Sequence, residues 1–175
     1  MSRLVIQNCN LAQGENLHHL SAELMSSRSL EFIDFQCNEL RDKHVSSITK
    51  LICAQYETRD LLRWKLGLRS PHVFDISKLG IKVYVLSRNN FSDHFAEQLS
   101  IALKSEEYIK FICLKKNDIG IRGLKCLAEA AFVHPGLLSM DLRDNPGYKK
   151  KESEKFKEIM KKCYFTNIAH EVLMT

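Results

Sequence analysis

The chain has 175 residues, of which 45% are hydrophobic and 27% charged, and its formal net charge at pH 7 is +5. This length allows one domain with a substantial core, and the composition is that of an ordinary globular protein. The chain contains no apolar run near the length of a membrane span, and its start, MSRLVIQNCN, lacks the apolar core of a secretory signal. We therefore expect a cytoplasmic protein that does not enter a membrane.

The charge and the cysteines indicate which partners and which redox state of the thiols to expect. The positive charge is modest and most of the excess lies from Lys149 onward, so we expect no nucleic-acid partner. The six cysteines are spread along the sequence and form no C-x-x-C pair. In a chain without an export signal, this pattern predicts reduced, structural thiols.

The first stretch, LVIQNCNLAQG, predicts a strand near residues 4–6 that is followed by a helix. Leu4 and Ile6 face one side of the strand because side chains alternate. The helix is indicated by leucines at helical spacing, namely Leu17, Leu20 and Leu24. Cys9 stands at a position that asparagine occupies in the later units.

The second stretch shows the same unit most clearly, around Asn38. Ile33 and Phe35 have the period of two expected of a strand, and Ile48 and Ile52 continue with the period of a helix. The unit around Asn117 repeats these offsets with Ile109, Ile112, Leu114, Ile119, Leu124, Leu127 and Ala131. In each unit we expect the asparagine amide to bond backbone groups of the turn.

Asn89, Asn117 and Asn145 are 28 residues apart, which identifies an internal repeat. The strands predicted for the repeated units lie near residues 33–35, 84–86, 112–114 and 140–142. A strand–turn–helix unit cannot bury its apolar face alone, so neighbouring units must stack. We therefore predict a single right-handed solenoid of parallel strands over residues 1–147.

The middle of the chain is irregular and leaves two alternatives. In the first, Leu61, Trp64 and Leu66 form a third strand, and residues 67–80 are a degenerate repeat whose helix is shortened or lost. In the second, the same stretch is a loop insertion in which Trp64 fills a gap. The composition does not decide between them.

The repeat ends at Pro146 and Gly147, and residues 148–175 form a second segment. Lysine and glutamate alternate there, while one helical face carries Phe156, Ile159, Met160 and Cys163. This pattern predicts an amphipathic helix that caps the last unit. Its lysine excess is either a solvated face or a patch for an acidic partner.

The pattern L-x-x-L-x-L-x-x-N/C-x-L at a spacing of 28 residues resembles the ribonuclease-inhibitor-like class of leucine-rich repeats. This resemblance covers nearly the whole chain. It implies an α/β solenoid with parallel strands on the concave face, helices on the convex face and a C-terminal capping helix. Because the class consists mainly of binding scaffolds of many kinds, it says little about function.

A narrower resemblance covers about residues 64–147. The chain is similar there to the family of the seventy-eight-kilodalton centrosomal leucine-rich-repeat protein, in the motifs W-K-L-G-L-R-S-P, D-I-S-K-L-G-I-K-V-Y-V-L-S-R-N-N, A-E-Q-L-S-I-A-L and M-D-L-R-D-N-P-G. The chain departs from that family at Phe95, where a glycine is expected. The resemblance implies a non-enzymatic adaptor at centrosomes, centrioles or ciliary bases that recruits centrosomal proteins and contacts a ubiquitin ligase.

No motif for catalysis, metal binding or cofactor binding is present. The sequence contains no HExxH, GxSxG, P-loop or GxGxxG motif, and no Cys/His spacing suits zinc. We interpret Gly120 and Gly123 as turn residues before a helix, not as a phosphate cradle. Surface positions at turns and helix flanks are expected for most of His18, His19, His44, His72, His94, His134 and His170. We predict no enzyme activity, no metal and no cofactor.

The candidate binding residues are those whose side chains point away from the core. Because side chains alternate, the residues six, four and two positions before each asparagine face the concave surface. In the expected third strand, these positions belong to Arg63, Lys65 and Gly67. An exposed protein-binding patch, apolar at its centre and charged at its rim, is predicted at Phe32, Asp34, Val83, Val85, Phe111, Lys115, Asp141 and Arg143. The alternative is that the C-terminal tail or a tight curvature covers these residues.

Two functions remain for a repeat domain that we expect to be monomeric. The first is an adaptor module that binds centrosomal or ubiquitin-ligase proteins on its concave face. The second is an activator of a small GTPase, since repeat proteins of this type include such activators. Asn90, Asp118 and Arg143 are conceivable rim residues for that second function, and only the second function predicts GTP hydrolysis by the partner.

Overall fold

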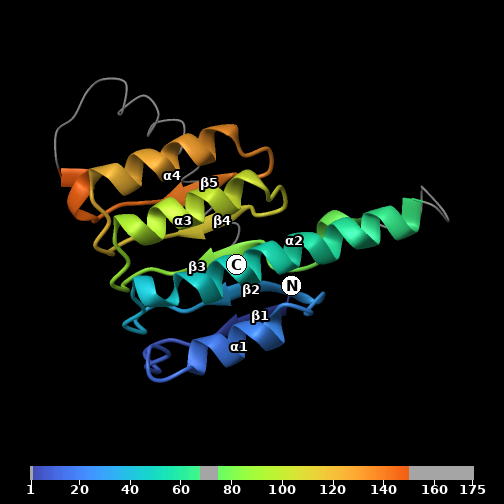
Figure 1. Ribbon diagram of the computed structural model, residues 1–175, viewed down its shortest axis with the longest axis horizontal. Helices are drawn as coiled ribbons and strands as arrows, with labels where there is room; N and C mark the ends of the chain where they lie inside the picture. The colour runs from blue at the N-terminus through green and yellow to red at the C-terminus, as the bar shows by residue number, and fades with distance from the viewer. Residues whose placement is uncertain (1, 68–74, 150–175) are drawn as a thin grey trace.

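The computed structural model of the chain describes residues 2–67 and 75–149. In this part of the chain, five parallel strands form one sheet in sequential order, and an α-helix connects each strand to the next (Figure 1). The strands are β1 (Ser2–Val5), β2 (Leu30–Asp34), β3 (Val83–Val85), β4 (Phe111–Cys113) and β5 (Ser139–Asp141). The helices are α1 (Asn16–Leu24), α2 (Val45–Gly67), α3 (Asp93–Lys104) and α4 (Ile121–Val133). The predicted α/β class with parallel strands is confirmed.

Three short 3-10 helices complete the described elements: η1 (Asp42–His44), η2 (Ile76–Lys78) and η3 (Pro146–Lys149). All five predicted strands overlap the observed ones. The predicted capping helix at residues 148–175 lies outside the described residues, apart from the two residues that end η3.

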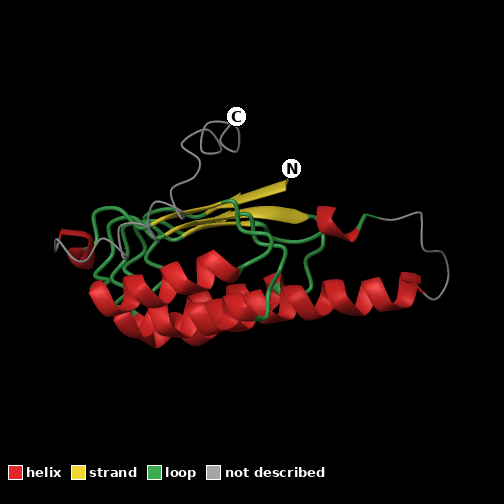
Figure 2. Cartoon of the chain, turned by 90° about the horizontal axis from the view of Figure 1, so that it is seen from above, coloured by secondary structure: helices red, strands yellow, loops and turns green. Residues whose placement is uncertain are grey.

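The four helices lie against one face of the sheet (Figure 2). We call the opposite face of the sheet the strand face. Ile33, Tyr84 and Ile112 are partners in register across β2, β3 and β4, and they belong to the large core beneath the helices. Because side chains alternate along a strand, their neighbours point to the strand face instead. This is the register that the asparagine spacing predicts.

The core between sheet and helices is built from the apolar stripes of the helices. Leu99 and Leu103 on α3 and Leu124 and Leu127 on α4 have exposed fractions of 0–1%. Their spacing of three or four residues places them on one side of each helix, so each helix presents one continuous apolar surface to the sheet.

The asparagines join neighbouring units. Asn117 accepts a hydrogen bond from the backbone N–H of Phe91 at 3.2 Å and donates to the carbonyls of Leu86 and Leu114 at 3.1 and 3.0 Å. Phe91 and Leu86 precede β4 and belong to the preceding unit, whereas Leu114 belongs to the same unit as Asn117. The expected bonds within the turn are confirmed, and the amide also bonds the unit before it.

The same arrangement recurs along the chain. Asn38, Asn89 and Asn145 are buried, and each bonds backbone groups of its own unit and of the preceding unit. Cys9 lies at the corresponding position of the first unit, where its side chain is exposed and its N–H donates to Asn38 Oδ1 at 2.9 Å.

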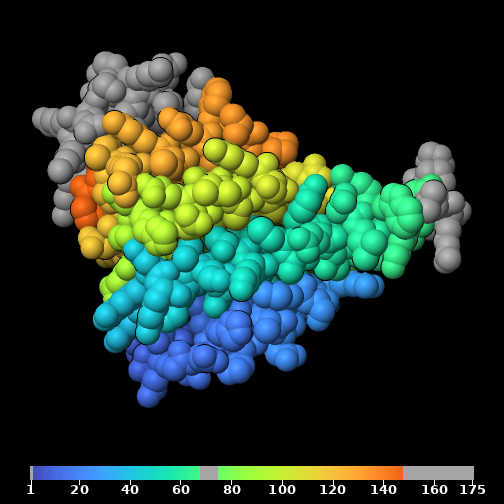
Figure 3. Space-filling view, viewed as in Figure 1, coloured from blue at the N-terminus to red at the C-terminus, as the bar shows by residue number. Residues whose placement is uncertain are grey.

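The predicted third strand in the middle of the chain is wrong, and so is the prediction that Trp64 fills a gap, whereas the alternatives for residues 67–80 fall largely on residues 68–74, outside the described residues. Residues 45–67 form the single long helix α2, so Arg63, Lys65 and Gly67 lie on a helix and not on a strand. Leu61 and Trp64 are 51% and 63% exposed, so Trp64 fills no gap. No glycine or proline interrupts the sequence between Val45 and Leu66, so nothing ends the helix earlier. Its end projects beyond the neighbouring helices (Figure 3).

A buried polar network anchors α2 to the sheet. Arg59 on α2 pairs with Glu106, with 2.9 Å between Nη1 and Oε1, and it also donates to the carbonyls of Leu79 and Ile81 at 2.8 Å. One turn earlier, Gln55 donates to three carbonyls that follow or end α1. No local sequence pattern indicates this network, because its members are far apart in the chain.

The expectation of surface histidines is wrong for His44 and His134, which are both 7% exposed. His44 Nδ1 accepts the backbone N–H of Arg41, and His134 Nδ1 accepts the backbone N–H groups of Gly136 and Leu137. Each ring therefore satisfies backbone donors where a helix begins or ends. His134 Nε2 also lies 3.5 Å from Glu106 Oε2.

Gly120 and Gly123 serve packing rather than a special turn conformation. Neither residue has a positive φ. A Cβ on Gly123 would lie 2.6 Å from Asp93 Oδ1 and 2.8 Å from the Cβ of Ala96. The N–H of Gly123 donates to the same Asp93 oxygen at 2.9 Å. These glycines allow α4 to approach α3 closely.

Candidate functional site

A hollow of about 310 Å³ lies on the strand face, across strands β2 to β5 and the turns that follow them. We call it the strand-face hollow. Its lining residues are Asp34, Gln36, Val85, Ser87, Arg88, Phe111, Cys113, Lys115, Asp141 and Arg143. Six of the eight predicted binding residues are in this set. The other two, Phe32 and Val83, lie beside it on the same face.

The apolar centre of the predicted patch is buried, which corrects the expectation that it is exposed. Five side chains form a cluster of their own, separate from the main core, and we call it the strand-face cluster: Phe32, Val83, Val85, Phe111 and Cys113. Their exposed fractions run from 1% to 7%. In-register partners lie side by side, and the guanidinium of Arg3 lies 4.2 Å from the ring centre of Phe32.

Two carboxylates form the polar part of this face. Asp34 is 4% exposed and accepts hydrogen bonds from the Gln7 side chain at 2.6 Å and from the Gln36 backbone at 3.0 Å. Asp141 is 7% exposed and accepts two bonds from the Arg143 guanidinium, at 2.9 and 2.7 Å. Burial opposes ionisation of Asp141, but the hydrogen bonds and charge of Arg143 outweigh it and hold the pKa of Asp141 below its usual value.

The basic side chains stand at the rim. Arg88 follows β3 and is exposed, while Lys115 follows β4 and lies 3.6 Å from Asp144. The aliphatic part of a lysine or arginine side chain can cover apolar surface while its charged group remains in water. The hollow therefore combines an apolar floor with a mixed rim of two carboxylates and three cations.

Cys113 lies in the floor of the hollow. Burial is the main cause that raises the pKa of its thiol. A thiol with a raised pKa carries little thiolate at neutral pH, so Cys113 is not arranged as a nucleophile.

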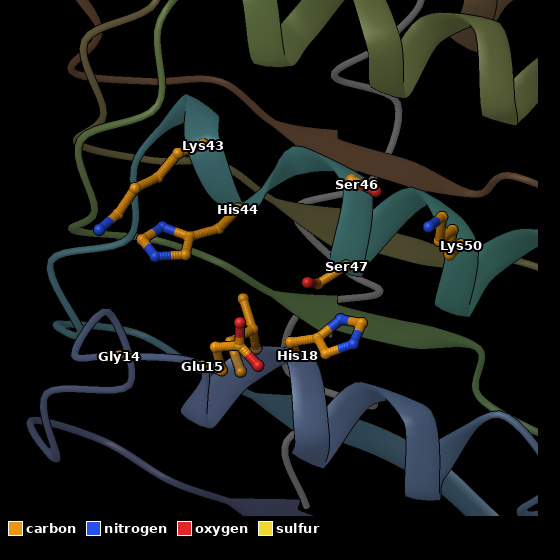
Figure 4. Close-up of a pocket in the computed structure, with 9 residues that line it drawn as sticks. Gly14, Glu15, His18, Lys43, His44, Ser46, Ser47 and Lys50 are labelled. Carbon is orange, nitrogen blue, oxygen red and sulfur yellow. The ribbon is translucent and has the colours of Figure 1, made fainter.

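A second hollow of about 300 Å³ lies between α1 and the start of α2, on the helical side of the sheet (Figure 4). Its lining residues are Gly14, Glu15, Leu17, His18, Lys43, His44, Ser46, Ser47 and Lys50. Burial, together with the charge of Lys43, lowers the pKa of His44. Carboxylate, lysine and imidazole groups mix here without converging on one point. This hollow selects no ligand class.

Among residues 2–67 and 75–149, no group of three or more His, Cys, Asp and Glu residues is placed to hold a metal ion. No helix there is both long and apolar enough to cross a membrane. Asn90 and Asp118 are exposed, whereas the guanidinium of Arg143 is already bonded to Asp141. No feature of these three residues favours a GTPase-activating role.

No model of a known protein family matches the chain, and no curated protein matches it.

Proposed function

We propose that the chain is a leucine-rich-repeat solenoid of the ribonuclease-inhibitor-like class and that it binds a protein partner on its strand face. The repeated strand–turn–helix units, the parallel in-order sheet and the buried asparagines that bond consecutive units support the solenoid. In such an array the strand face is the concave surface and the helices form the convex one. We propose that residues 1–147 are this domain and residues 148–175 its C-terminal cap and tail.

The strand-face hollow is the observation that carries the binding proposal. Four neighbouring strands and their following turns contribute to it, so a partner that enters it contacts four units at once. An apolar floor inside a charged rim is the usual anatomy of a protein interface, in which the apolar centre supplies affinity and the rim supplies orientation. The side chains that carry the proposal are Phe32, Asp34, Val83, Val85, Phe111, Lys115, Asp141 and Arg143.

We further propose that the biological setting is a non-enzymatic adaptor in the cytoplasm, at the centrosome, the centriole or the ciliary base. The support is the motif series from Trp64 to Gly147, which closes with M-D-L-R-D-N-P-G. The partners in this proposal are centrosomal proteins or components of a ubiquitin ligase, and the chain acts as a monomer without cofactor.

The test uses changes at the rim, where a substitution leaves the buried floor intact. The pair Arg88→Asp with Lys115→Asp reverses two cations of the hollow. The matched control, Lys65→Asp with Lys104→Asp, makes the same charge change at two exposed positions on α2 and α3.

Proximity labelling in ciliated cells should then give one set of centrosomal or ligase proteins for the wild type and the control, and the rim pair should lose it. A rim pair that keeps the whole set would show that the partner uses another surface. Labelling that finds no centrosomal or ligase protein with any form would contradict the adaptor setting.

A further inference from the structure

Two exposed cations occupy corresponding positions at the turn side of the strand-face hollow, and we call them the turn cations: Arg88 and Lys116. Arg88 lines the hollow after β3, and Lys116 follows β4. Each stands directly before the repeated asparagine of its unit, Asn89 or Asn117, and the backbone φ angles at the two positions are 54° and 55°. The repeat therefore places the turn cations in one row, in neighbouring units.

The backbones of these neighbouring units stay paired as far as the turn cations. The N–H of Arg88 donates to the carbonyl of Lys115 at 2.9 Å, and the N–H of Lys116 donates to the carbonyl of Arg143 at 3.0 Å. Paired strands lie about 4.8 Å apart, and like charges opposite each other on paired strands lower stability. Folding alone therefore does not account for two cations in this row, whereas an anionic partner does.

The carboxylates around the turn cations are engaged elsewhere or do not pair with them. Asp141 accepts two hydrogen bonds from Arg143, and Asp144 lies 3.6 Å from Lys115. Asp118, which follows shortly after the second turn cation, is exposed. Among residues 2–67 and 75–149, neither turn cation forms an ion pair. Two positive charges at the hollow can therefore pair with a partner.

We propose that the partner contacts the strand face through an acidic segment whose Asp or Glu carboxylates pair with Arg88 and Lys116. This inference rests on the proposed function, because it names the chemistry of the partner at the same hollow. A guanidinium and a carboxylate can form two parallel hydrogen bonds, and a lysine ammonium adds a point charge beside them. Contacts of this kind orient the partner and speed its association, and salt weakens them.

The charges around the hollow favour an acidic protein segment over a nucleic acid. Asp118 and Asp144 are exposed and lie close to the turn cations in the sequence. A nucleic acid carries a negative charge at each phosphate along its whole length and depends on many cations for its affinity. A protein segment with a few carboxylates can pair with the turn cations and leave Asp118 and Asp144 in water.

The probe is a fluorescein-labelled hexaglutamate peptide, and its binding to the complete chain is measured by fluorescence anisotropy. Hexaglutamine has the same backbone and nearly the same side-chain size but no charge, so it should bind much more weakly. Added salt should weaken the binding of hexaglutamate, since exposed charges are screened. The turn-cation variant, Arg88→Gln with Lys116→Gln, should weaken it about fivefold, the size expected for two exposed ion pairs.

Two matched controls each remove the same amount of positive charge. Lys65→Gln with Lys104→Gln changes exposed residues on α2 and α3. Lys157→Gln with Lys161→Gln changes the lysine-rich part of the sequence after the repeats. Both controls should bind hexaglutamate as tightly as the wild type does. The melting curve of the turn-cation variant should match that of the wild type, because both of its substitutions are at exposed positions.

Three results would overturn the proposal. Hexaglutamine could bind as tightly as hexaglutamate, which would mean that charge does not select the segment. The turn-cation variant could bind hexaglutamate like the wild type, or the Lys157→Gln, Lys161→Gln chain could lose as much affinity, and either would place acidic binding elsewhere. A labelled oligothymidylate could bind more tightly than hexaglutamate and depend on the turn cations, which would assign this surface to a nucleic acid.

Failure of this inference is distinct from failure of the proposed function. If hexaglutamate does not depend on the turn cations while proximity labelling still depends on the rim, the partner is not acidic and the proposed function stands. If hexaglutamate binds at the turn cations while labelling is unchanged by the rim substitutions, the surface selects acidic segments and the proposed function is wrong.

Discussion

Arg59 on α2 and Glu106, which follows α3, form an ion pair in which each side chain is only 2% exposed. Glu106 also accepts the backbone N–H groups of Tyr108 and Ile109 at 2.7 and 2.8 Å. The pair therefore fixes the long helix, the end of α3 and the start of β4 to one another. Both charges are satisfied by several partners, which is the condition under which a buried ion pair is tolerated.

Removing one member of this pair should destabilise the chain strongly. Arg59→Met leaves the Glu106 carboxylate buried without its cation, and we expect a loss of about 3–5 kcal/mol in the free energy of unfolding. Urea denaturation measures it. The control is Arg63→Met, because Arg63 pairs with Glu107 at the half-exposed surface, and such a pair contributes about 1 kcal/mol or less. Equal losses for the two variants would contradict the buried network.

Asn117 should matter far more than the exposed Asn90, which lies one position after Asn89, the repeated asparagine of the preceding unit. Asn117→Ala removes an acceptor for the Phe91 N–H and a donor to two carbonyls, all buried. We expect a loss of about 1–3 kcal/mol, because buried backbone groups are left unpaired. Asn90→Ala removes an exposed side chain and should be near neutral. Thermal and urea unfolding of both variants check the difference, and equal effects would mean that the units are wrongly aligned.

Asn117 and Trp64 show which parts of the fold can be predicted from the sequence and which cannot. The period of 28 residues and the alternation along the strands locate Ile112 and Asn117, because both signals depend only on local spacing. At Trp64 the same signals predict a strand about one repeat after β2, although the spacing between Asn38 and Asn89 is 51 residues. The stretch instead continues as a helix held by Arg59, whose partner is 47 residues away.

The candidate site was predictable in position but not in exposure. Alternation places Val85 and Phe111 on the strand face, since it follows from strand geometry alone. Whether that face meets water depends on what lies over it, and no local pattern records this. The burial of these residues corrects the expectation of an exposed apolar centre.

Gly123 should not tolerate even an added methyl group. Alanine normally favours a helix by about 1 kcal/mol over glycine. Here the new Cβ would lie 2.6 Å from Asp93 Oδ1 and 2.8 Å from Ile119 Cγ2, so Gly123→Ala should lower the melting temperature. Gly67→Ala is the matched control at the end of α2, where nothing lies within 4 Å of the added Cβ. That variant should keep or slightly raise the melting temperature, and circular dichroism follows both.

His44 should make stability depend on pH. Its pKa is lowered in the folded chain from 6.5, mainly by burial and then by Lys43. Between the folded pKa and 6.5 the unfolded chain binds more protons, so the free energy of unfolding rises with pH and is lost as pH falls. His44→Asn, which keeps an acceptor for the Arg41 N–H, should remove this part of the slope. Urea denaturation at pH 5 and pH 7.5 compares the two proteins, and identical slopes would contradict the assignment.

The burial of the strand-face cluster changes what a charge placed there should do. An exposed patch would accept Phe111→Asp with Val85→Asp without loss of stability, and this is what an exposed apolar centre predicts. Phe111 and Val85 are only 4% and 5% exposed. The double substitution would therefore place two carboxylates in a dry cluster and remove the apolar contacts that these two side chains make there. We expect a loss of at least about 3 kcal/mol and a chain that is largely unfolded at 37 °C.

The control that distinguishes a buried cluster from an exposed one is Arg88→Asp, a single charge change at the exposed rim of the same hollow. It should leave the melting curve within about 0.5 kcal/mol of the wild type. A Phe111→Asp, Val85→Asp chain that melts like Arg88→Asp would show that the cluster faces water in solution, and its burial would then be incorrect. A large gap between the two curves means that binding must be tested from the rim, since changes in the floor destroy the sheet on which the site is built.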